Sequence, residues 1–193
     1  FRSPLPSGGG KAAPDAPNRA VAIVRWDEVD AAIKQIEAAF QKEWASVCRE
    51  AIREIGGKGL DTLNDPAWKA IWERQVGRYW EAYWAAAKMA GGDYAQGYRD
   101  AIRALESAKR QRAFEPNTEA GAKDSLSGAR QALRTEKLDA REYWSEFTRP
   151  GRFFPSRIYA GGRERLDALG AVKRFCPTGG ETFPSTSSVA SAD

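Results

Sequence analysis

One stretch of the sequence, Asp27 to Ile55, repeats apolar residues at steps of three and four, and no other feature limits the possible folds as strongly. At 100° per residue these apolar residues fall within an arc of about 100°. They are Val29, Ile33, Ile36, Phe40, Trp44, Val47, Ala51 and Ile55. The pattern predicts one long amphipathic helix, about 43 Å in length. We expect it to end at the glycine pair Gly56-Gly57, because glycine commonly follows the last turn of a helix.

Capping residues, prolines and glycines mark the ends of further helices. Asp65-Pro66 combines a residue suited to an N-cap with proline at the first helical position. Asp93 follows the pair Gly91-Gly92 in the same capping role. Together with the apolar pattern, these signals predict helices over residues 66–90, 93–114, 118–147 (as two helices) and 163–174.

The fold class that these elements predict is all-α, because no stretch indicates a sheet. We expect an irregular helical bundle with one long amphipathic helix and extended arms at both ends of the chain. The predicted organisation has three parts, which are an extended basic arm rich in proline and glycine (1–25), a helical domain (26–175) and a disordered or extended tail (176–193).

Composition argues against most catalytic chemistry. The sequence contains no histidine, which removes imidazole acid–base catalysis and imidazole metal sites. Two cysteines, Cys48 and Cys176, are too few for a four-thiolate zinc site, although one disulfide is open to them. Cys48 falls near the apolar face of the long helix, where we expect a small buried side chain. We therefore predict no enzyme activity, no catalytic residue, no cofactor and no metal.

Charge and hydropathy narrow the expected partners. Thirty Lys and Arg residues stand against 26 Asp and Glu, and the resulting net charge of +4 is mild for 193 residues. No apolar run reaches the roughly 18 uncharged residues that a membrane-spanning helix needs. We expect a soluble or peripheral chain without a transmembrane segment, and an intracellular, organellar or virion location rather than secretion.

The predicted second helix is unusually rich in aromatic residues. On a helical projection, Trp72, Tyr79 and Tyr83 share one stripe with Trp68, whereas Trp80 and Trp84 lie at about 120° and 160° from it. Three interpretations are open for Trp80 and Trp84: burial against a second element, a protein-contact surface, or a pocket for a flat ligand. We take both tryptophans as candidate partner contacts.

Two further groups of residues are candidates for binding. The segment 149–159 mixes arginine with aromatic residues, as protein interfaces often do, and its candidate partner contacts are Arg152, Phe153, Phe154, Arg157 and Tyr159. The end of the predicted third helix carries a modest basic stripe. Its candidate polyanion contacts are Arg99, Arg103, Lys109, Arg110 and Arg112.

These observations favour a non-catalytic structural or accessory subunit that contacts neighbouring proteins in a larger assembly, such as a virion or an organellar complex. The alternative is a helical binding module for nucleic acid or another polyanion. That alternative predicts an affinity that falls steeply with salt. An enzyme or cofactor carrier that uses the Trp80 and Trp84 surface is the third hypothesis, and the sequence shows no nucleophile with a base to support it.

Overall fold

The computed structural model describes residues 19–56, 62–111, 118–149, 158 and 161–176 of the chain. Its elements are η1 (Trp26–Glu28), α1 (Val29–Gly56), α2 (Pro66–Gly77), η2 (Ala90–Gly92), α3 (Tyr94–Arg110), α4 (Ala140–Phe147) and α5 (Ala168–Phe175). Within the described residues, β-type pairing is limited to one antiparallel bridge between Lys123 and Gln131. The predicted all-α fold is therefore confirmed.

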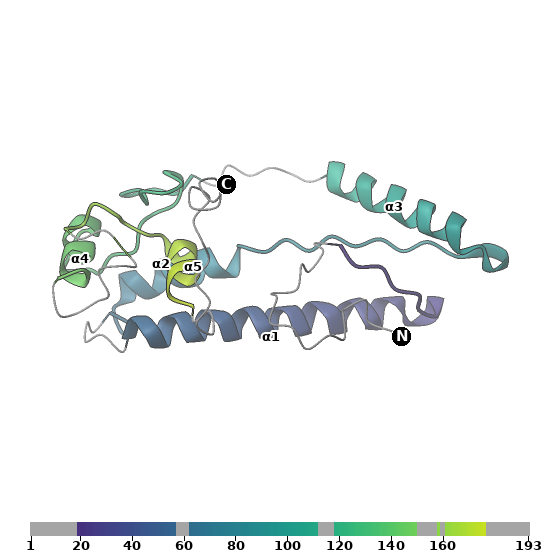
Figure 1. Cartoon of the computed structure of the whole chain (residues 1–193), viewed down its shortest axis with the longest axis horizontal. Coiled ribbons are helices and arrows are strands. Elements are labelled where there is room, and N and C mark those ends of the chain that lie inside the picture. The colour runs from purple at the N-terminus through teal and green to yellow at the C-terminus, as the bar shows by residue number, and fades with distance from the viewer. Residues whose placement is uncertain (1–18, 57–61, 112–117, 150–157, 159–160, 177–193) are drawn as a thin grey trace, which may run out of the picture.

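The molecule divides into a compact lobe and a long extension (Figure 1). The lobe contains the last third of α1 together with α2, α4 and α5. The extension, residues 19–47 and 77–111, consists of residues 19–28, the first two thirds of α1, an extended segment that runs beside it, and α3, which folds back along that segment. The long helix predicted from the apolar repeat is thus present, and it connects the two parts.

Aromatic side chains fill the core of the lobe. Phe147 of α4 lies 5.6 Å from Phe175 of α5, measured between ring centroids, and both side chains are fully buried. Trp68 stacks on Trp72 within α2 at 5.0 Å, and its Nε1 donates to the hydroxyl of Tyr143. Burial of such large rings is the main favourable term for a core of this size. From α1 this core receives Cys48, Ala51 and Ile55.

One buried amide joins three elements of the lobe. Nε2 of Gln75 donates to the carboxylate of Glu119 and to the backbone oxygen of Gln131, and its Oε1 accepts from the backbone N–H of Ala168. Arg74 completes the network through an ion pair of 3.0 Å with Glu119. Burial acts to raise the pKa of Glu119, but hydrogen bonds from Arg74, Gln131 and Gln75 hold that pKa below its usual value. The network fixes α2 against the start of α5.

The predicted end of the second helix is wrong, because α2 stops at Gly77 rather than at Ala90. Nε1 of Trp44 donates to the backbone oxygen of Val76, which is one of the carbonyls that a helix end leaves without a partner. Glycine in the last turn also lowers the preference for continuing the helix. Residues 80–89 belong to no helix or strand. Trp80 and Trp84 therefore lie on an extended segment and not on a helical face.

The two helices predicted over residues 118–147 are also wrong in part, because only α4 forms there. Residues 118–139 instead make turns in which Gly121 and Gly128 adopt φ values of 93° and 65°. The carboxylate of Asp124 accepts from the backbone N–H groups of Leu126, Ser127 and Arg130, which holds the turn closed. Asp93 caps α3 as predicted. The last helix is shorter than predicted, since Asp167 caps α5 only at Ala168.

The lobe core predicts a large difference between two single substitutions. Replacing the fully buried Phe147 with alanine should lower the free energy of unfolding by about 3–5 kcal/mol, because it leaves a cavity among aromatic neighbours. Leu126→Ala, at a side chain that is 62% exposed, should change it by less than about 0.5 kcal/mol. Urea unfolding measures both values. Equal losses in the two variants would contradict the assignment of the core.

Candidate functional site: an exposed aromatic extension

No residue of the extension is buried, although its sequence contains many large apolar residues. Residues 19–47 and 77–111 are all exposed or only half-buried. Eleven large apolar side chains of the extension, between Val21 and Tyr98, are at least 40% exposed. They are Val21, Ile23, Val24, Trp26, Ile36, Phe40, Trp80, Trp84, Met89, Tyr94 and Tyr98. Contiguous exposed apolar patches are a common feature of protein interaction surfaces.

Four aromatic rings where the extension meets the lobe hold the extended segment on α1. Trp80 lies 5.2 Å from Phe40 and 5.8 Å from Trp44, edge-on to both rings. Tyr79 lies 5.4 Å from Trp44 and 4.8 Å from Trp80. Edge-to-face pairs at these distances are favourable beyond the apolar area that they bury. The cluster fixes the start of the segment, although Trp80 itself stays 47% exposed.

A second, weaker set of contacts lies toward the far end of the extension. The ammonium group of Lys88 sits 5.0 Å from the ring centroid of Trp26, in cation–π geometry. Arg19 pairs with Glu106 of α3 at 3.2 Å, and both side chains are more than 40% exposed. Tyr94 stacks on Tyr98 at 6.1 Å on the surface of α3. Exposed contacts of this kind add little to stability, so the far end is held loosely.

The structure places only two of the seven predicted partner contacts. Trp80 and Trp84 both lie on the extended segment, and Trp84 is 45% exposed. Arg152, Phe153, Phe154, Arg157 and Tyr159 lie outside the described residues. Sequence reasoning missed the exposed side chains of α1 and α3, because a helical stripe indicates which face is apolar and not whether anything covers it.

Four of the five predicted polyanion contacts lie on α3, and Arg112 is outside the described residues. Two of the four face acidic or polar neighbours on the same helix. Arg99 donates to the amide oxygen of Gln96, and Arg103 lies 3.8 Å from a carboxylate oxygen of Asp100. With Asp100 and Glu106 counted against its four bases, α3 keeps a net charge of only +2. The stripe is therefore a weak source of positive potential.

The two cysteines show no sign of activation. Burial, together with the nearby Cys176, raises the pKa of the Cys48 thiol to about 11. Burial and the charge of Glu50 also raise the pKa of Cys176. A thiol with a raised pKa is a poor nucleophile near neutral pH, because little thiolate is present. Cys48 is 6% exposed, consistent with a side chain that packs in the core.

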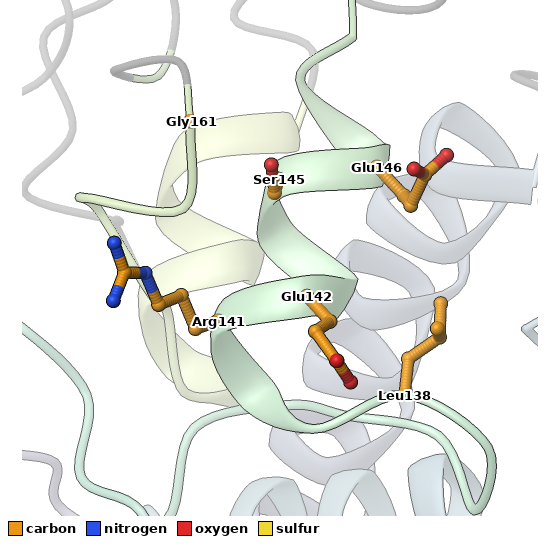
Figure 2. A pocket seen from close by; sticks show the side chains of 6 residues that line it. All are labelled: Leu138, Arg141, Glu142, Ser145, Glu146 and Gly161. Atoms are coloured by element: carbon orange, nitrogen blue, oxygen red, sulfur yellow. The ribbon is translucent and has the colours of Figure 1, made fainter.

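A shallow hollow on the lobe has the residues of a surface rather than those of a binding site. It lies along α4 and is lined by Leu138, Arg141, Glu142, Ser145, Glu146 and Gly161. Figure 2 shows Arg141 projecting to one side of α4 and the two glutamates to the other. Glu142 is used in the capping box at the start of α4, and Glu146 pairs with Arg149 at 2.8 Å. The acidic groups at its rim therefore already serve the local structure.

Within the described residues, no group of three or more Asp, Glu or Cys side chains is arranged to hold a metal ion. No helix there is both long and apolar enough to cross a membrane.

Comparison with known proteins gives no relative from which to transfer a function. No family model matches the chain, and neither the curated proteins nor the solved structures contain a significant match.

The aromatic cluster predicts that Trp80 and Trp84 respond differently to truncation. Trp80→Ala removes three ring contacts and should release the extended segment from α1, so that the rate of trypsin cleavage after Lys88 should change. Trp84, which makes no ring contact within the described residues, provides the control, and Trp84→Ala should leave the cleavage rate unchanged. Timed digestion followed by mass spectrometry measures both rates. Equal rates in the wild type and in Trp80→Ala would contradict the assigned role of the cluster.

Proposed function

We propose that this chain is a non-catalytic structural subunit that docks on neighbouring proteins of a larger assembly through its extension. The observation that carries the proposal is the exposure of the extension, where aromatic and aliphatic side chains lie on the surface and none is buried. Tryptophan and tyrosine in such positions are enriched at protein interfaces and supply much of their binding energy. Docking would bury Trp26, Ile36 and Trp84, whose present exposure to water is unfavourable.

The two-part architecture supports the same function. The lobe contains a complete aromatic core and needs no partner for its own burial. The extension has no core, so an adjoining surface is what would remove its apolar side chains from water. A stable lobe with a projecting contact element is a suitable arrangement for a subunit whose task is to connect neighbours.

The native mass of the chain tests this proposal. In a gently prepared extract of its source, we expect the chain to elute far above 21.2 kDa in size-exclusion chromatography with light scattering. Trp84→Asp should shift the chain toward free monomer, because it puts a charge into the contact surface without touching the lobe core. Leu126→Asp is the matched control, since Leu126 is an exposed apolar side chain of the lobe, and it should leave the mass unchanged. A wild-type chain that elutes as a clean monomer would contradict the proposal.

Polyanion binding is the second candidate, and one feature of α3 favours it. At 100° per residue, Arg99, Arg103 and Arg110 fall within about 40° of each other, so they share one face of the helix. If this face binds nucleic acid, the affinity should fall steeply as the salt concentration increases. Arg103→Gln and Arg110→Gln together should lower the magnitude of the slope of log affinity against log salt concentration by about two. Fluorescence anisotropy with a labelled oligonucleotide measures both. Absence of binding at low salt would remove this candidate.

A further inference from the structure

The extended segment between α2 and α3 has the composition of a helix. Residues 78–90 contain five alanines together with Glu81, Lys88 and Met89, all of which rank among the best helix formers. Glycine bounds the segment at both ends, at Gly77 and at Gly91-Gly92. Gly91 and Gly92 adopt φ values of 61° and 79°, which lets the chain reverse direction there. The helix propensity of residues 78–90 therefore disagrees with their extended conformation.

Tertiary contacts to α1 and η1 are what oppose that preference. Near its start, Trp80 packs against Phe40 and Trp44, and near its end Lys88 lies over Trp26. The three residues that receive these contacts are at most half-buried. No residue between the two contact points is buried either. These contacts, together with those of the half-buried Tyr79 with Trp44 and with Lys173 of α5, hold a helix-forming sequence in an extended conformation.

A helical conformation would supply replacement contacts within the segment itself. Residues four apart face each other on a helix, so Trp80 would pair with Trp84 and Tyr79 with Tyr83. Lys88 would lie one turn from Trp84 and could exchange its cation–π contact with Trp26 for one with that ring. The same side chains can therefore satisfy either conformation.

We propose that residues 78–90 form a two-state element, which is extended while Trp80 and Lys88 contact α1 and η1 and helical once those contacts are released. In the helical state, α2 would continue to Ala90 over about 37 Å. Trp80, Tyr83 and Trp84 would then leave α1 together, and α3 would move with the end of the lengthened helix. The proposal concerns the chain alone and does not require that the extension docks on a partner. A partner that binds one state better would shift the population toward it.

Spin labels at Arg78→Cys and Ala90→Cys, in the full chain with Cys48 and Cys176 replaced by alanine, test the proposal. The 12 peptide steps between these positions span up to about 40 Å when extended and about 18 Å when helical. Pulsed electron–electron resonance should show mainly the long distance in the otherwise unchanged chain. Adding Trp26→Ala, Phe40→Ala and Trp44→Ala removes the contacts of Trp80 and Lys88 without altering the segment, and should raise the ratio of short to long distances by about tenfold or more.

Two matched variants complete the experiment. Ile36→Ala, on the same face of α1 as Phe40 but 60% exposed, should leave the long distance in place. Adding Ala86→Pro to the Trp26/Phe40/Trp44 variant should abolish the short distance, because proline breaks a helix interior but fits an extended chain. The proposal is overturned if the released variant keeps the long distance or gives only a broad distribution between the two values. It is also overturned if the wild-type segment is already entirely short, or if Ala86→Pro has no effect.

The native mass in extract tests the proposed function, and its outcome is independent of these distances. A chain that switches but elutes as a monomer would retain the two-state element and lose the docking role. A chain that elutes in a large assembly but shows a single distance between the spin labels would retain the docking role and lose the two-state element.

Discussion

Trp44 of α1 makes the contacts on which the shape of the extension depends. Its indole N–H donates a hydrogen bond to the backbone oxygen of Val76, and its ring contacts those of Tyr79 and Trp80 just beyond the end of α2. One side chain thus ends α2 and directs the following residues along α1. Without it, the helix-forming sequence after Gly77 would have no tertiary reason to extend. The open arrangement of the chain therefore follows from one hydrogen bond and one aromatic cluster.

The lobe and the extension differ in how they are stabilised. In the lobe, the rings of Phe147 and Phe175 are fully removed from water, and a buried amide ties α2 to α5. In the extension, contacts are half exposed and ion pairs lie at the surface. Local stability follows buried area, so the extension should open at a lower free energy than the lobe. A part that opens readily and exposes tryptophans is well suited to fold against another protein, which is the role proposed for it.

Sequence reasoning predicted the fold where local signals and tertiary contacts agree. The apolar repeat predicted α1, and Asp65 and Asp93 predicted the starts of α2 and α3. It failed over residues 78–90, because the contacts of Trp80 with Phe40 and Trp44 override helix propensity there. It failed again over residues 118–139, where turns held by Asp124 replace a helix. The first failure comes from contacts between residues far apart in the sequence, and the second comes from local turn contacts of Asp124 that an apolar pattern does not show.

The candidate site was predictable only in its chemistry. An excess of tryptophan marked Trp80 and Trp84 as residues to explain, but the pattern placed them on a helix. The exposure of Ile36 and Tyr94 could not be read from periodicity, since an amphipathic stripe looks the same whether or not a neighbour covers it. The extension can be identified as an exposed apolar surface only from the fold, which shows how few residues pack against it.

Amide hydrogen exchange of the isolated chain and of the chain in its native assembly tests the central claim most directly. The account predicts that amides of α3 exchange fast in the isolated chain and become strongly protected in the assembly, while those of α4 and α5 are slow in both. Slow exchange throughout α3 in the isolated monomer would contradict the account, as would α3 amides that stay equally fast in the assembly.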